Sequence, residues 1–269
     1  MELRFKTSHV LLLAGAVALW TAPALAQSQT ERRTDTEVRT LIEQVDTGRD
    51  KFEGNLEGKL KGSTLRDATK EVSVEAALQD YQDNVKKLKD RFMPEYSASA
   101  EVVTVLKQAE GFDKFMKATP TVVKGRSEWE HHVADLNRLA AVYATTFPIK
   151  EGVAARRIND KETAEFAGAI ADAADKVKDE FDKVPVTALP KPQKDAVKKS
   201  LELLEKQAEN VKSRVGDHKP ATAETRQLIS QVAAAQKLLD AHPTPSAAGS
   251  WGALQSALNS LQQAFNLPK

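Results

Sequence analysis

Cysteine is absent from all 269 residues, and so is every Asn-x-Ser/Thr glycosylation sequon. The first absence excludes a disulfide framework, a lipid-anchoring cysteine and the Cys-x-x-Cys-His attachment of covalent haem. A secreted eukaryotic domain of this size usually shows disulfides, sequons or both. The two absences together therefore favour a bacterial periplasmic or secreted protein.

The sequence also lacks the short motifs that mark the common enzyme classes. It contains no Gly-x-Ser-x-Gly elbow, no phosphate-binding glycine loop, no dinucleotide fingerprint and no His-Glu-x-x-His. Hydrolase and transferase functions are disfavoured on this basis. We expect a protein that is not an enzyme and that needs no cofactor.

An excess of one charge is missing as well, because 39 Lys and Arg residues face 38 Asp and Glu residues. The two signs are interleaved along the chain, as on solvated helix faces, and no basic stripe with aromatic residues appears. Nucleic acid and anionic membranes are accordingly poor candidates for a partner.

The one long apolar run lies at the N-terminus. Arg4 and Lys6 precede an apolar segment from Val10 to Trp20, and a small-residue Ala24-Leu25-Ala26 site follows. The segment is shorter than a membrane-spanning helix, which needs about 20 residues. Residues 1–26 are therefore predicted to be a secretory signal peptide, after whose cleavage no membrane association is expected.

The clearest positive feature is an internal repeat. Residues 74–121 align without a gap on residues 197–244 at a constant offset of 123, with an offset of 125 before this block and 122 after it. A repeat of about 120 residues is close to a common domain size. The identical pairs of the central block include Leu78/Leu201, Arg91/Arg214, Glu101/Glu224, Gln108/Gln231 and Pro120/Pro243.

Apolar residues recur at three- and four-residue steps in both copies, which predicts amphipathic helices and no strand. Thr34 with Glu37, Ser127 with Glu130 and Asn159 with Glu162 are predicted N-terminal caps. Short connections favour antiparallel neighbours, so the predicted fold is all-α, a tandem duplication of two antiparallel four-helix bundles. The expected helices are 31–60, 73–92, 97–118, 127–147, 160–183, 191–216, 222–241 and 247–265, with 63–72 unassigned. The expected domains are a first bundle at 27–148, a linker at 149–159 and a second bundle at 160–269.

Two tryptophans occupy equivalent positions, Trp129 and Trp251. Each begins an apolar stripe along its helix, so packing is favoured over ligand binding and both are predicted to be structural anchors.

The densest group of polar residues surrounds Trp129. Glu128 and His131 form a Glu-x-x-His motif of the di-iron type, but at 100° per residue His131 lies on the solvent face, so no metal site is predicted. His132 lies beside the apolar stripe, where the second copy has Leu254. A buried histidine with a hydrogen-bond partner is the favoured interpretation. The alternative is an axial ligand to b-type haem, opposite Met93 or Met116.

In the linker, Arg156 and Arg157 are predicted either to bind a carboxylate ligand or to pair across the junction between the copies, and the junction role is favoured. His218 and His242 are interpreted as helix-end residues. The resulting hypothesis is an exported, non-catalytic helical protein that acts by binding, as an interaction or scaffold module of the cell envelope whose partner is another envelope protein. The alternative is a carrier of a small ligand or b-type haem in the first bundle around His132.

Overall fold

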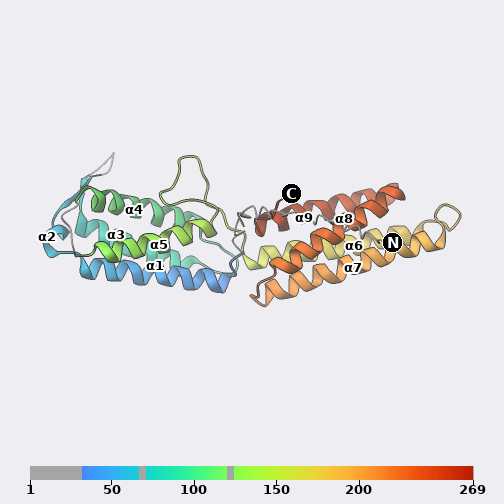
Figure 1. Ribbon diagram of the computed structural model, residues 1–269, viewed down its shortest axis with the longest axis horizontal. Helices are drawn as coiled ribbons and strands as arrows, with labels where there is room; N and C mark the ends of the chain where they lie inside the picture. The colour runs from blue at the N-terminus through green and yellow to red at the C-terminus, as the bar shows by residue number, and fades with distance from the viewer. Residues whose placement is uncertain (1–31, 67–70, 120–123, 269) are drawn as a thin grey trace, which may run out of the picture. The chain divides into compact units, whose positions relative to one another are not determined.

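The computed structural model describes residues 32–66, 71–119 and 124–268, and the chain is mostly helical over these ranges. Nine α-helices and one short 3-10 helix are present in the described residues (Figure 1). The all-α prediction is therefore confirmed. The expected signal peptide, residues 1–26, lies outside the described residues.

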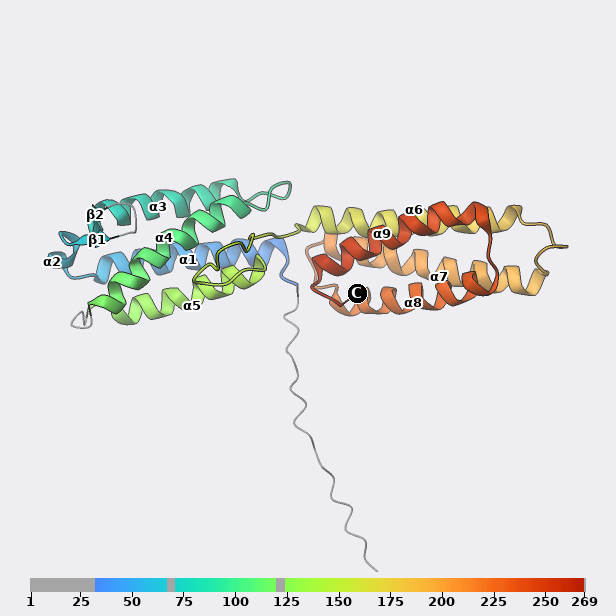
Figure 2. The same cartoon turned by 90° about the horizontal axis from the view of Figure 1, so that it is seen from above.

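A first group of helices surrounds one hydrophobic core, which contains Phe52, Tyr81, Phe112 and Leu136. The helices of this group lie side by side in both views of the ribbon (Figures 1 and 2). We call them the first helix group: α1 (Asp35–Asn55), α3 (Val74–Arg91), α4 (Ser99–Ala118) and α5 (Arg126–Val142).

A second group surrounds a separate core, which contains Ile170, Phe181, Leu204 and Leu254. Its helices begin and end within one residue of the expected bounds. We call them the second helix group: α6 (Asp160–Lys183), α7 (Lys191–Gly216), α8 (Thr222–Ala241) and α9 (Ala248–Ala264), with the 3-10 turn η1 (Pro245–Ala247) before α9.

The interval after α1 departs from the expectation. α1 ends at Asn55, where the sequence pattern predicted a helix to residue 60, and a single turn α2 (Gly58–Lys61) follows. Two three-residue strands, β1 (Thr64–Arg66) and β2 (Glu71–Ser73), then pair antiparallel, although no strand was predicted. Leu56, Leu60 and Leu65 are buried against the first core. These three leucines attach the segment to the first core. Each strand has three residues, which is too short for an alternating apolar pattern to be recognised in the sequence.

The helix starts agree with two of the three predicted caps. Thr34 and Asn159 each accept a hydrogen bond from the backbone of Glu37 and Glu162, whose side chains bond back to the capping residues, so both capping boxes are confirmed.

The predicted cap at Ser127 is wrong, because α5 begins at Arg126 after Gly125. Gly125 has a φ of +87°, and a Cβ at this position would lie 3.3 Å from the backbone of Leu56. Glycine is required here for both reasons, and it starts the helix before Ser127 is reached.

Both tryptophans are buried in their cores. Trp129 is 3% exposed, its ring centroid lies 4.8 Å from that of Phe52, and its Nε1 donates to Asp113 Oδ1 at 3.3 Å. Trp251 is 8% exposed, and its Nε1 donates to Gln236 Oε1. The predicted stripes therefore face the interior, and each indole N–H has a partner inside the protein.

Candidate functional site

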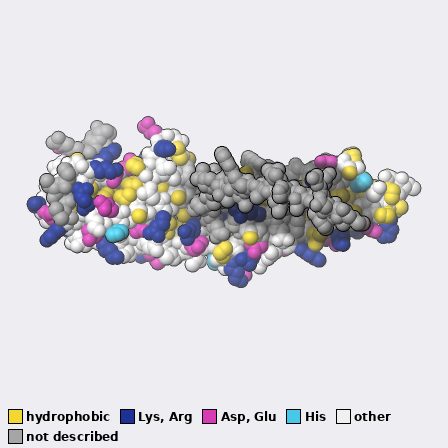
Figure 3. Space-filling view, viewed as in Figure 1, with side chains coloured by type: hydrophobic (Ala, Val, Ile, Leu, Met, Phe, Trp, Pro, Cys, Tyr) yellow, Lys and Arg dark blue, Asp and Glu magenta, His cyan; other side chains and the backbone are white. Residues whose placement is uncertain are grey.

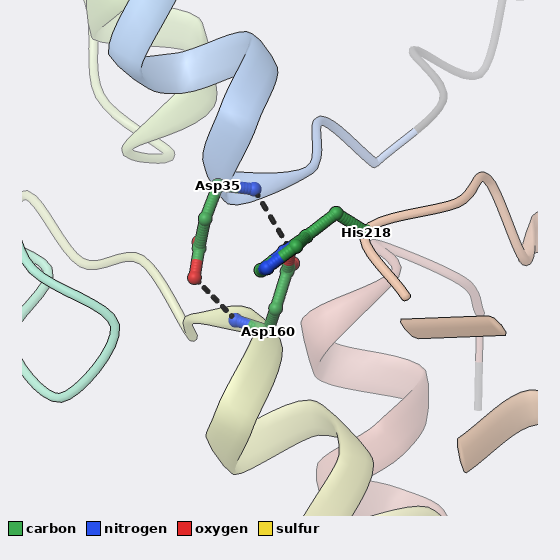
Figure 4. Close-up of side chains that lie close together, drawn as sticks. All are labelled: Asp35, Asp160 and His218. Atoms are coloured by element: carbon green, nitrogen blue, oxygen red, sulfur yellow. Dashed lines mark hydrogen bonds and ion pairs between the residues drawn. The ribbon is translucent and has the colours of Figure 1, made fainter. Parts of the chain in front are cut away.

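The main cluster of buried charged residues lies where α1 and α6 begin. Asp35 and Asp160 are the first residues of these two helices, and they are 6% and 2% exposed. Their carboxylates point toward each other's backbone, and His218 approaches from the end of α7 (Figure 4). We call these three residues, together with Arg32 and Arg157, the junction cluster.

Each aspartate completes the start of the other helix. The Asp35 N–H donates to Asp160 Oδ2 at 2.9 Å, and the Asp160 N–H donates to Asp35 Oδ2 at 3.1 Å. The first N–H groups of a helix have no partner within the helix and carry a partial positive charge. A carboxylate from the opposite helix satisfies both requirements at once.

Two arginines neutralise the aspartates. Arg32 Nη1 lies 2.6 Å from Asp160 Oδ1, and Arg157 Nη1 lies 2.5 Å from Asp35 Oδ1. All four side chains are less than a tenth exposed. The structure thus places Arg157 at the junction, whereas Arg156 is exposed beside it.

His218 joins the cluster from the second helix group. It follows α7 with a φ of +56°, and its Nδ1 lies 2.7 Å from Asp160 Oδ2. The sequence interpretation placed His218 at a helix end, which is its position, but did not foresee its contact with an aspartate about 60 residues away.

The donor atoms of Asp35, Asp160 and His218 lie within 4.8 Å of one another, a spacing that a metal ion could bridge. The surrounding charges oppose this use, because two fixed guanidinium groups already balance two carboxylates. A divalent cation would have to displace an arginine that is almost completely buried. The donor set therefore fits a structural ion-pair cluster better than a metal centre.

Two effects act on the pKa of Asp160. Burial raises it, but the charge of Arg32 and the hydrogen bonds from the Asp35 backbone and His218 outweigh burial and hold the pKa below the ordinary value of 3.8. Asp160 is thus a poor general base, which argues against acid–base catalysis at the junction cluster.

His132, the candidate cofactor-binding residue, lies in the core of the first helix group and is 0% exposed. Its Nε2 lies 2.7 Å from the hydroxyl of Tyr81 on α3. Burial and the nearby Arg49 guanidinium lower its pKa to about 3, so the ring is neutral at physiological pH. Among the described residues Nδ1 has no hydrogen-bond partner, and it faces Gly48, where a Cβ would come within 2.7 Å.

This geometry bears on haem ligation. A histidine that coordinates iron through Nε2 would have to give up its contact with Tyr81. Of the two methionines considered as the opposite ligand, Met116 is buried in α4 and Met93 is 49% exposed in the turn after α3. The ring is held as a core histidine with a hydrogen-bond partner.

The neighbouring Glu128 and His131 do not join this buried site. They line an open groove of about 520 Å³ between α1 and α5, together with Glu43, Lys51 and Arg138. Both charge signs are present along it, so the groove has no strong preference for an anion or a cation.

The burial of His132 gives a testable pH dependence. Its folded pKa is lowered, so its contribution to stability is fully present above the unfolded pKa of about 6.5 and is lost as the pH falls toward the folded value of about 3. We expect His132→Leu to show a shallower fall in unfolding free energy between pH 7 and pH 4 than the wild type, in urea titrations at each pH. His131→Leu is the matched control, because His131 is exposed. Parallel profiles for the wild type and His132→Leu would contradict the burial argument.

Comparison with known proteins adds no family to this description. No protein-family model, no curated protein and no solved structure matches the chain. The case for function therefore depends on the residues themselves.

Among the described residues, none of the helices combines the length and the hydropathy that a membrane span requires.

Proposed function

We propose that this protein is an exported, non-catalytic binding protein of the bacterial cell envelope, built as a tandem duplication of two antiparallel four-helix bundles. The proposed bundles are residues 27–148 and 160–269, joined by the linker 149–159. In this proposal the chain acts as a periplasmic interaction or scaffold module whose partner is another envelope protein.

Equivalent contacts in the two helix groups support the duplication. The capping boxes of α1 and α6 use Thr34 and Asn159, which are 125 residues apart. The indoles of Trp129 and Trp251 donate to Asp113 and Gln236, which occupy equivalent positions of α4 and α8 at an offset of 123. The residue types differ, but the helix cap and the hydrogen bond of the indole are present in both helix groups. Shared contacts of this kind are expected if one bundle arose as a copy of the other.

The observation that carries the non-catalytic proposal is the pairing of charges at the junction cluster. Arg32 pairs with Asp160, Arg157 pairs with Asp35, and His218 also contacts Asp160. Catalytic acids and bases need a group that is free to exchange a proton with a substrate. Here the charged groups are used to hold two helix starts together.

The surface supports a protein partner over a polyanion. On the face drawn in Figure 3, Lys and Arg side chains of the described residues lie next to Asp and Glu side chains. A nucleic-acid or anionic-membrane site needs a patch of one sign. The mixed surface fits short-range recognition of another protein.

One observation favours the second candidate function, a carrier of a small ligand or b-type haem in the first bundle. His132 Nδ1 is buried and has no hydrogen-bond partner in the part of the chain that the structure describes, and the second copy has an apolar residue, Leu254, at the equivalent position. A ligand site is expected to use residues that differ between the copies.

Native mass spectrometry of the mature protein purified from its own periplasm separates the two functions. The binding-module proposal expects the mass of the bare chain, alone or in a defined ratio with a second protein. The carrier proposal expects a small added mass, together with a haem absorbance band if the ligand is haem. His132→Leu is the control variant: an added mass that disappears in it would overturn the binding-module proposal.

A further inference from the structure

The two short ion pairs of the junction cluster form an exchanged pair, whereas the contact of His218 with Asp160 is specific to the second copy, because Glu95 occupies the equivalent position in the first. Arg32 contacts Asp160, and Arg157 contacts Asp35, at 2.6 and 2.5 Å. Arg157 and Asp160 lie 125 residues after Arg32 and Asp35. Interchanging the two copies therefore converts each ion pair into the other.

The backbone contacts follow the same rule. The reciprocal N–H bonds of Asp35 and Asp160 form one exchanged pair. A second pair is formed by the arginines: Arg32 Nη2 donates to the carbonyl of Ile158 at 3.3 Å, and Arg157 Nη2 donates to the carbonyl of Arg33 at 2.9 Å. Arg33 and Ile158 are also 125 residues apart, although their side chains differ.

Such exchange defines an isologous interface, in which the same patch on both partners contacts itself. It is the usual interface of a symmetric homodimer and arises rarely between unrelated surfaces. Here each copy supplies one arginine, one aspartate and one helix N-terminus. Two copies together give two ion pairs and no uncompensated charge.

We propose that the helix-start end of each bundle is a self-complementary docking surface whose partner is a second copy of the same bundle, so that the chain is a covalently fused homodimer. This proposal rests on the tandem duplication proposed above. The bundle's partner at this surface is thus another bundle that presents the Arg-x-x-Asp spacing at the start of its first helix.

One further ion pair favours the pairing of unlike copies. Lys161 Nζ of the second helix group lies 3.8 Å from Glu95 Oε1 of the first helix group. The residue equivalent to Lys161 in the first copy is Thr36, which cannot form this pair. Both side chains are exposed, so the preference for pairing unlike copies is small. Pairs of two first copies or of two second copies therefore remain accessible.

A nicked protein tests the proposal. A protease recognition sequence placed in the exposed segment 151–154 would allow the folded chain to be cut between the copies. The cut protein is unfolded in urea, refolded and analysed by native mass spectrometry, in which the two halves have different masses. We expect first–first and second–second pairs beside the first–second pair. Refolded halves that form only the first–second pair would overturn the proposal and leave the duplication and the binding function standing.

The intact chain provides a second measurement that does not require either half to fold alone. Arg32→Gln and Arg157→Gln remove equivalent members of the two short ion pairs. Their urea midpoints should fall by amounts that agree within about twofold, because each substitution leaves one buried aspartate without its nearest guanidinium group. Arg156→Gln, an exposed neighbour in the linker, is the control and should leave the midpoint unchanged. A large shift in one arginine variant and none in the other would contradict an isologous interface.

Discussion

Trp129→Ala is expected to unfold the first helix group well before the second. The substitution removes a side chain that is 3% exposed. Its ring centroid lies 4.8 Å from that of Phe52 and 6.0 Å from that of Phe112. Replacing a buried tryptophan by alanine typically costs about 3–5 kcal/mol, because transfer energy is lost and a cavity remains. The second core shares no residue with the first, so it keeps its contacts. Differential scanning calorimetry should therefore show a new transition at lower temperature, with the remaining transition near its original position.

Trp251→Ala is the matched control for this experiment. Trp251 is 8% exposed in the second core, and its loss should lower the other transition by a similar amount. Which transition belongs to which helix group is then assigned from the pair of variants. One cooperative transition that shifts equally in both variants would show that the two cores unfold as a single unit.

The helices could largely be predicted from the sequence because each has an apolar stripe and clear ends. In the second helix group α6 contains a single glycine, Gly168, and Pro190 directly precedes α7. The predicted helix bounds therefore agree with the observed ones. The end of α1 was misplaced because its glycines do not distinguish a weakened helix from a turn. There the contact of Leu60 with the core decided the structure, and a contact between distant residues leaves no periodic signal.

The junction cluster could not be predicted in the same way. Helical period determines which face of a helix is buried, but not which helix ends meet. The repeat did contain a usable signal: Arg32 and Asp35 have the same residue types at the same spacing as Arg157 and Asp160. This repeated spacing predicts ion pairs between the two helix starts only if the first copy is assumed to bind the second. The position of His132 beside the stripe was predictable, whereas its contact with Tyr81 depends on which side chains of α3 and α5 meet in the core of the first helix group.

Asp160→Asn is expected to destabilise the protein strongly at neutral pH. The aspartate is the shared partner of Arg32, the Asp35 backbone and His218. Its neutral replacement leaves the Arg32 guanidinium buried without a full counter-charge, and removing one member of a buried pair costs about 3–5 kcal/mol. Urea unfolding at pH 7 measures the loss. Asp195→Asn is the control, because Asp195 pairs with Lys191 at an exposed site, where a contribution of about 0–1 kcal/mol is expected.

The difference between the wild type and Asp160→Asn should depend on pH in a defined direction. The folded pKa of Asp160 lies below the unfolded value of about 3.8, so the unfolded chain takes up the proton first as the pH falls. The stabilisation is therefore fully present above the unfolded pKa and is lost as the pH falls through the folded pKa. Arg32, the counter-charge of Asp160, stays protonated throughout this range, so the carboxylate of Asp160 is the member of this ion pair whose charge changes. The gap in urea midpoint between the two proteins should be widest at pH 5 to 7 and narrow toward pH 3. A gap that is constant over this range would mean that the Asp160 carboxylate contributes through its shape and hydrogen bonds, and that its charge is not what holds α1 and α6 together.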